Sequence, residues 1–203
     1  MIKVLLVGGG GHCKSCIDVI EAENQYEIVG FLNTQTNESI NVLGYPHLGT
    51  DDDLGVLKQD YASALVAVGQ IKSPNLRIKL YSQLKELGFS LPIVKSPLAY
   101  ASRYSTIGSG TIIMHNALIN ASSKIGENCI INSQALIEHD VTVGDHCHIS
   151  TGAKLNGGVR VGSGTFIGSG SVISSRVEIG GNCVIGAGMT IKHNIPSQTV
   201  IKN

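Results

Sequence analysis

The chain has 203 residues, which is enough for one large domain or two small ones. Its 15 basic and 15 acidic residues give a formal net charge of zero, so the composition argues against nucleic acid and anionic membranes as partners and favours small molecules or proteins. No stretch approaches the roughly 18 apolar residues of a membrane span. The five cysteines are odd in number, and we expect them to be reduced in a cytoplasmic protein.

Residues 1–95 are predicted to form a small Rossmann-like α/β domain with a parallel sheet. The apolar run from Ile2 to Val7 predicts a buried strand, and a glycine-rich loop separates it from a helix over residues 15–23. Strand, glycine loop and helix in this order make the first half of a βαβ unit. The same alternation then continues to a link near residues 95–101. The further elements are strands over 26–32 and 63–68 and helices over 51–59 and 74–87.

The glycine loop, Gly8 to Gly11, partly matches two nucleotide-binding motifs. Cys13 stands where a P-loop needs the glycine before its lysine, and also where a dinucleotide fingerprint needs its last glycine. The second strand ends in Asn33 and Thr34 in place of the acid that binds an adenosine ribose. Both motifs share exposed amides at a helix N-terminus, which attract phosphate. We therefore expect a nucleotide-linked ligand here, with a purely structural tight turn as the alternative.

A strict six-residue period follows. Every sixth residue from 107 to 191 is Ile, Leu or Val, and a second, mostly small register comes four residues after each. This is the hexapeptide repeat of a parallel β-helix, in which three hexapeptides make one 18-residue triangular turn and glycines serve corners that need backbone freedom. We expect the coil over residues 101–191 and a short tail over 192–203. The small inward register includes Cys129, Cys147 and Cys183.

The sequence Glu138-His139-Asp140 is the strongest candidate for chemistry in the repeat. His139 and Asp140 lie off both inward registers, so neither is needed for the core. His148 occupies a position that is apolar in the other four turns. A carboxylate beside an imidazole can hold its tautomer and support a general base. The alternative is that these are solvated surface histidines.

Five segments spread over the whole chain carry a resemblance to a known family. They are Gly8 to His12, Gly30 to Leu32, Val66 to Gly69, Ile137 to Asp140 and His148 to Ala153. Together they resemble the NeuD/PglD family of sugar acyltransferases. The resemblance implies a left-handed β-helix and a homotrimer. It also implies that acetyl-CoA, as co-substrate, lies in a groove between neighbouring coils, with a sugar nucleotide on the N-terminal domain. No metal is expected.

The resemblance also implies roles for single residues. His139 is the expected base, Asp140 supports its basicity, and Asn132 contacts the sugar. The positions expected to face acetyl-CoA are His148, Gly157, Ser169 and Ala187. The positions expected to bind the nucleotide-sugar are Gly10, Gly11, His12 and Gly69, with Asn33 and Thr34 where relatives often carry two acids. Gln70 to Ser73, with Lys14 and Ser15, is similar to the NeuD branch, whose acceptor would be a sugar hydroxyl.

The expected reaction is direct acetyl transfer from a thioester to the amine or hydroxyl of a sugar. Two other functions stay open. His139, His146 and His148 could be ligands of a zinc site shared between subunits, as in β-helix carbonic anhydrases, because three imidazoles and a water form a known catalytic zinc site. The chain could also be a non-catalytic subunit that binds a sugar nucleotide.

Overall fold

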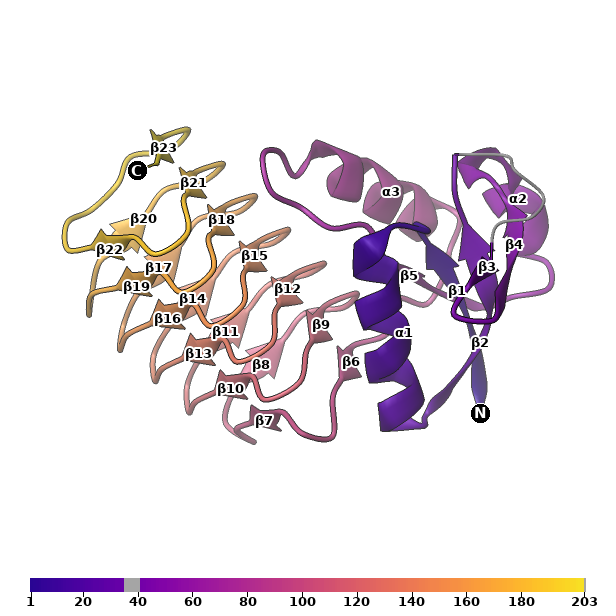
Figure 1. Cartoon of the computed structure of the whole chain (residues 1–203), viewed down its shortest axis with the longest axis horizontal. Coiled ribbons are helices and arrows are strands. Elements are labelled where there is room, and N and C mark those ends of the chain that lie inside the picture. The colour runs from indigo at the N-terminus through magenta and orange to yellow at the C-terminus, as the bar shows by residue number, and fades with distance from the viewer. Residues whose placement is uncertain (35–40, 203) are drawn as a thin grey trace.

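The computed structural model describes residues 1–34 and 41–202, which form an α/β domain followed by a coil of short strands (Figure 1). Among its described residues, the α/β domain has a five-stranded sheet in the order β3-β4-β2-β1-β5, in which the β3–β4 pair is antiparallel and the other pairs are parallel. This confirms the predicted parallel α/β fold. The strands are β1 (Ile2–Val7), β2 (Tyr26–Leu32), β3 (Asn41–Val42), β4 (Tyr45–Gly49) and β5 (Ser63–Val66). The helices are α1 (Gly11–Glu23), the 3-10 turn η1 (Asp51–Asp53), α2 (Leu54–Leu57) and α3 (Asn75–Glu86).

Helix α1 joins the two parts of the molecule. Its buried face, which includes Cys16, Ile17 and Ile20, packs in one cluster with the β1 and β2 side chains and with Ile112 and Ile130 of the coil. Burial of apolar surface on both sides of one helix stabilises the α/β domain and the coil as a single core. The helix begins at Gly11, four residues before the predicted start, because Gly10 is its extended N-cap and the last glycine of the loop already belongs to the helix.

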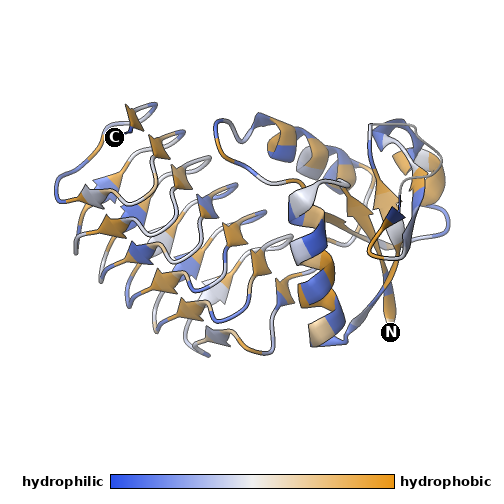
Figure 2. Cartoon of the chain, in the orientation of Figure 1, coloured by the Kyte–Doolittle hydropathy of each residue, from blue (hydrophilic) through white to orange (hydrophobic). Residues whose placement is uncertain are grey.

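The coil has three parallel faces, and each strand contributes two residues to its face. Figure 2 shows hydrophobic residues along these strands and more polar residues in the turns between them. The first face contains β6 (Val94–Lys95), β9 (Ile112–Ile113), β12 (Ile130–Ile131), β15 (His148–Ile149), β18 (Phe166–Ile167), β21 (Val184–Ile185) and β23 (Val200–Ile201). The second face contains β7 (Tyr100–Ala101), β10 (Leu118–Ile119), β13 (Leu136–Ile137), β16 (Lys154–Leu155), β19 (Val172–Ile173) and β22 (Thr190–Ile191). The third face contains β8 (Thr106–Ile107), β11 (Lys124–Ile125), β14 (Thr142–Val143), β17 (Arg160–Val161) and β20 (Glu178–Ile179).

The predicted inward registers are confirmed: their aliphatic residues form the coil's core, and Cys129, Cys147 and Cys183 are buried free thiols within it. Strand pairing reaches past both ends of the range 101–191. Val94 pairs with Ile112 before the hexapeptide register starts, and Val184 pairs with Val200 across 16 residues instead of 18. The six-residue period therefore cannot reveal either end.

The glycines that recur every 18 residues, such as Gly126 and Gly144, do not serve the corners that need backbone freedom, although the sequence predicts that they do. Gly126 and Gly144 have no left-handed backbone, but a Cβ on Gly126 would lie 2.7 Å from the Gly144 carbonyl carbon in the next turn. They are therefore required by the close stacking of turns. The left-handed corner positions are others, six residues apart, such as Asp140 (φ 61) and His146 (φ 57).

Within the described part of the chain, no helix has the length and apolarity needed to cross a membrane.

Candidate functional site

A cavity of about 580 Å³ lies between the α/β domain and the coil. It opens at the carboxyl ends of β1, β2 and β5, which is where open parallel sheets bind ligands. His148 closes it from the first face of the coil. Seven of the predicted site residues come together here. They are Gly10, Gly11, His12, Asn33, Thr34, Gly69 and His148.

The four glycines of the loop have two different roles. Gly8 has φ of 124°, and a Cβ there would lie 2.6 Å from Val68 Cγ2, while a Cβ on Gly9 would lie 2.6 Å from the Phe31 ring. These two are required by packing. A Cβ on Gly10 or Gly11 would have no atom within 4 Å. A tight turn alone therefore accounts for Gly8 and Gly9 but not for Gly10 and Gly11, whose main-chain atoms face the cavity without a side chain.

The N-terminus of α1 forms part of that wall. The helix begins at Gly11, and its N-cap, Gly10, has no side chain with which to cap the first amides. Unpaired first-turn N–H groups carry a partial positive charge and bind anions such as phosphate. The cavity therefore contains a helix N-terminus that can bind an anion, next to the exposed main chain of Gly10 and Gly11.

Two neutral histidines lie next to this helix end, with ring centroids 6.4 Å apart. Burial, with a smaller contribution from the Arg77 charge, lowers the pKa of His12 to about 3. Its Nε2 atom is buried without a hydrogen-bond partner among the described residues. Burial likewise lowers the pKa of His148 to about 4, against the raising effect of its hydrogen bond to Gln70. Both rings are neutral near pH 7.

The hydrogen bonds of His148 fix its tautomer. Nδ1 lies 2.6 Å from the main-chain oxygen of Gln70, which can only accept, so Nδ1 carries the proton. Nε2 then accepts from Asn132 Nδ2 at 3.1 Å. His148 is only 6% exposed. The ring faces the cavity and the loop after β5, and the role toward acetyl-CoA that the resemblance implies for it stays a prediction.

His139 and Asp140 form an exposed pair on the turn between β13 and β14. Nδ1 of His139 lies 2.8 Å from Asp140 Oδ2, and since a carboxylate accepts, Nδ1 carries the proton and Nε2 keeps a free lone pair. The ring lies over Gly157 one turn further along, where a Cβ would come within 2.8 Å of Nε2. A free imidazole nitrogen backed by a carboxylate can accept a proton from a nucleophile.

The predicted site residues in the turns of the coil lie on two of its three edges. The turn with His139 and Asp140 joins the second face to the third, as does the turn with Gly157. Asn132, Ser169 and Ala187 lie on turns that join the first face to the second, where Ser169 Oγ is 2.9 Å from Ser150 Oγ. His139 is therefore on the edge opposite the first face, and within one chain it is separated from the cavity by the width of the coil.

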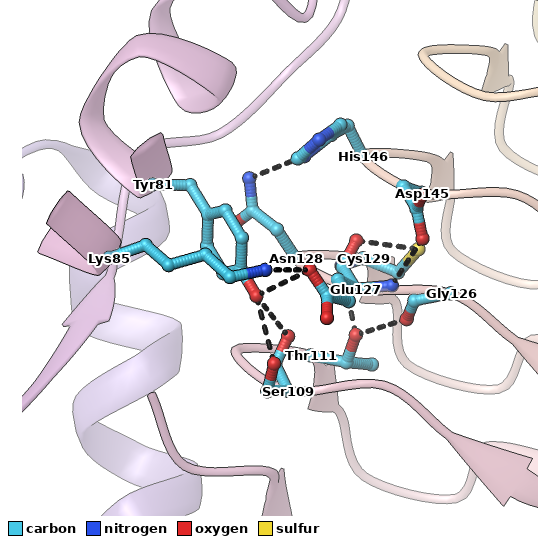
Figure 3. Close-up of polar contacts among 10 residues, drawn as sticks. All are labelled: Tyr81, Lys85, Ser109, Thr111, Gly126, Glu127, Asn128, Cys129, Asp145 and His146. Atoms are coloured by element: carbon cyan, nitrogen blue, oxygen red, sulfur yellow. Dashed lines mark hydrogen bonds and ion pairs between the residues drawn. The ribbon is translucent and has the colours of Figure 1, made fainter. Parts of the chain in front are cut away.

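His146 lies on the third type of edge, between the third and first faces, and takes part in the contact with α3 (Figure 3). Its Nδ1 is 3.0 Å from Asn128 Nδ2, and its ring meets Tyr81 edge to face. Across residues 1–34 and 41–202, no three His, Cys, Asp or Glu side chains are grouped so that they could hold a metal ion. The three histidines of the zinc alternative thus lie apart in a single chain.

Comparisons with known proteins identify the family. Residues 3–84 match the PglD N-terminal domain, and residues 104–139, 122–157 and 158–193 match the bacterial transferase hexapeptide repeat. Perosamine N-acetyltransferase from Caulobacter crescentus, solved as a mutant with CoA and GDP-perosamine, is 32% identical, with a TM-score of 0.91 over 98% of this chain and 92% of that one. The chain belongs to the NeuD/PglD family of sugar acyltransferases.

Other family structures agree. The acetyltransferase domain of PglB from Neisseria gonorrhoeae, solved with acetyl coenzyme A, is 32% identical, with a TM-score of 0.89 over 97% of this chain and 95% of that one. WeeI from Acinetobacter baumannii, at 21% identity, shares the fold with a TM-score of 0.81 over 100% of this chain and 97% of that one. A search of curated proteins gave no match. The coil of this NeuD/PglD-family chain is a left-handed β-helix, as the resemblance implied.

The roles of two residues at the junction of the domains were not predicted from the sequence, in which Gln70 was noted only as part of the segment Gln70 to Ser73. Arg77 of α3 is 1% exposed and donates to the Val68 oxygen at 2.6 Å and to Asn128 Oδ1 at 2.7 Å. Gln70 is 3% exposed and contacts the coil at two points. Both look like ordinary surface residues in a helix and a loop, because the sequence does not show that the coil covers them.

Proposed function

We propose that this NeuD/PglD-family chain is an acetyl-CoA-dependent acetyltransferase that transfers an acetyl group to the amine or hydroxyl of a sugar. The observation that carries the proposal is the free imidazole of His139, paired with Asp140, on the coil of a chain 32% identical to a perosamine N-acetyltransferase. The cavity at the α1 N-terminus supports a nucleotide-linked or otherwise anionic sugar as acceptor. Relatives solved with CoA, acetyl coenzyme A and GDP-perosamine have the same fold.

In the proposed reaction, the acceptor nitrogen or oxygen attacks the thioester carbonyl while His139 Nε2 takes its proton. The new C–N or C–O bond replaces the C–S bond, and the proton passes to the departing thiolate of CoA. A general base of this kind contributes about 10²–10⁴-fold. Main-chain N–H groups of the coil would stabilise the oxyanion, for which one donor contributes about 10²–10³-fold. The buried thiols of Cys129, Cys147 and Cys183 point into the core, which supports direct transfer without an acetyl-cysteine.

We propose further that the enzyme is a homotrimer in which neighbouring chains complete each site. The cavity lies on the first face, and His139 lies on the opposite edge of the same coil. A cyclic assembly would bring the edge of one coil to the groove of the next. The second face supports this arrangement, because four of its six outward residues, Tyr100, Leu118, Leu136 and Val172, are apolar or aromatic, and the other two are Lys154 and Thr190. The third face has polar residues at the matching positions, which are Thr106, Lys124, Thr142, Arg160 and Glu178.

The test is an acceptor screen that follows thiol release from acetyl-CoA. UDP-, GDP- and CMP-linked sugars and free sialic acid are compared for the wild-type protein and for His139→Ala. We expect turnover with one acceptor class, and a kcat at least about 100-fold lower for His139→Ala with acetyl-CoA binding retained, because a base acts on the transition state. Near-normal kcat for His139→Ala would refute the base. Binding of the acceptor without any thiol release would favour a non-catalytic subunit.

A further inference from the structure

The loop after β5, residues 67–74, forms one wall of the cavity and is fastened to the coil by Gln70. The main-chain oxygen of Gln70 accepts from His148 Nδ1 at 2.6 Å, and its side-chain Nε2 donates to the Gly164 oxygen at 3.2 Å. Gly164 itself makes room for the loop, because a Cβ there would lie 3.1 Å from Pro74 Cγ. A buried glutamine that bonds to two turns of the coil holds this wall at a fixed distance from His148.

Donor and acceptor are fixed in each hydrogen bond that links Gln70, His148 and Asn132. Because the Gln70 carbonyl accepts from Nδ1, the His148 Nε2 atom is an acceptor, and it receives an N–H from Asn132. Asn132 Oδ1 in turn accepts the main-chain N–H of Ser133 at 2.8 Å. The orientation of the Asn132 amide is therefore set at both ends. Its Nδ2 has two hydrogens, and His148 uses one of them.

A different protonation state of His148 would break these hydrogen bonds. A protonated or flipped-tautomer His148 would direct an Nε2–H at the Asn132 amide N–H groups, two donors facing one another. Burial and the Arg77 charge both lower the pKa of His148, so the ring stays neutral. The carbonyl of Gln70 then selects between the two neutral tautomers, which solvent alone would not do.

We propose that Gln70 is a positioning residue for His148, which lines the cavity: fastened to Gly164, it holds its main-chain oxygen on Nδ1 of His148 and fixes the Nδ1–H tautomer, so that Nε2 stays an acceptor. The effect on the acceptor sugar rests on the proposed function, whereas the tautomer is a property of the protein alone.

Nitrogen NMR of protein labelled with ¹⁵N-histidine tests the tautomer without substrate. We expect one ring with a fully protonated Nδ1 and an unprotonated Nε2 from pH 7 to pH 5, and this signal should be lost in His148→Asn. Gln70→Met keeps the length of the buried side chain and removes both the Gly164 bond and Oε1, which has no partner among the described residues. Its effect should therefore be on the loop and not on folding. In Gln70→Met the His148 signal should move toward the average of the two tautomers.

Kinetics tests the consequence for the ligand. Gln70→Met should raise the acceptor KM at least about 5-fold with the acetyl-CoA KM unchanged, because only the cavity wall is released. Gln59→Met, on an exposed glutamine at the end of α2, is the matched control and should change neither the NMR signal nor the kinetics.

The outcomes separate the two proposals. An Nε2–H tautomer in the wild-type protein, or an unchanged His148 signal in Gln70→Met, overturns the role of Gln70 whether or not the enzyme turns over. An unchanged acceptor KM in Gln70→Met overturns the effect of Gln70 on the cavity. Absence of thiol release with every acceptor, together with the expected tautomer, counts against the proposed function alone.

Discussion

The empty space at Gly157 determines where the His139 ring lies. Gly157 has no left-handed backbone, so alanine can replace it without backbone strain, yet its Cβ would come within 2.8 Å of both Cε1 and Nε2 of His139. The ring must then move away from its place over the coil. We expect Gly157→Ala to lower kcat by about 10- to 100-fold, since a displacement near 1 Å in a reacting group has an effect of that order. Steady-state kinetics with the identified acceptor measures the change.

A double variant distinguishes this effect from loss of an acetyl-CoA contact, the role predicted for Gly157 from the resemblance. If alanine acts only by moving the imidazole, Gly157→Ala should lower kcat no further in a chain that already has His139→Ala. Additive losses in the double variant, or a raised acetyl-CoA KM with normal kcat, would show that Gly157 contacts the co-substrate instead.

Single functional residues could be predicted where they depart from the pattern of the hexapeptide repeat. His139 and Asp140 stand out because the hexapeptide registers assign them to a turn, and the structure places them there as a hydrogen-bonded pair. The same registers identify His148 as unusual on the first face but cannot show what covers it. Its partner Gln70 is 78 residues away in the chain, and no local pattern connects the two.

Among the elements, the N-terminus of α1 has the clearest chemical role. Gly11 is exposed, and a side chain there would meet nothing within 4 Å of its Cβ, so Gly11→Val fits the fold while filling the space beside the first amides. We expect the acceptor KM to rise at least about 10-fold and the acetyl-CoA KM to stay the same, because the helix end binds the anionic part of the acceptor alone. Thermal unfolding should be unchanged.

Gly55→Val is the control for this helix end, since Gly55 in α2 also has open space around its Cβ but does not line the cavity. Its kinetics should match the wild type. Equal loss of affinity for both substrates in Gly11→Val would contradict the anion-binding role and leave the glycines a structural function only.

Elements of the coil were predictable because each two-residue strand follows directly from one inward aliphatic residue. The α/β domain was predictable in order and type, with shifted ends: the predicted helix over 51–59 is a 3-10 turn followed by the four-residue helix α2. The ends of the coil were not, because β6 and β23 pair with it through backbone hydrogen bonds that need no hexapeptide. Pairing of main-chain groups leaves little trace in side-chain periodicity.

For the whole molecule, the two cavity histidines make stability depend on pH. Their folded-state pKa values, about 3 for His12 and about 4 for His148, lie below the ordinary value of 6.5. Below pH 6.5 the unfolded chain therefore takes up protons that the folded chain does not, and the free energy of unfolding falls as the pH falls from 6.5 toward 4. The expected loss is about 1.4 kcal/mol per pH unit for each histidine.

Urea unfolding at pH 7.0, 6.0 and 5.0 measures this dependence, above the range in which most carboxyl groups titrate. The variant His148→Asn should lose its own share, about 1.4 kcal/mol per pH unit, while His12 and His146, whose pKa burial also lowers, keep theirs. A free energy of unfolding that is constant between pH 6.5 and pH 5.0 would mean that the two rings are accessible to protons in the folded protein.

The separation of cavity and base within one chain makes a prediction about the assembly. His139→Ala chains keep an intact cavity, and Gly11→Val chains keep an intact base, so each kind alone should have low activity at an acceptor concentration well below the KM of Gly11→Val. If neighbouring chains complete each site, a trimer that contains both kinds of chain has both parts intact at one of its three sites. Mixed trimers isolated with two affinity tags should therefore recover about a third of the wild-type activity. If cavity and base instead act within one chain, no mixed trimer can exceed the sum of its parents, and light scattering that reports an active monomer would lead to the same conclusion.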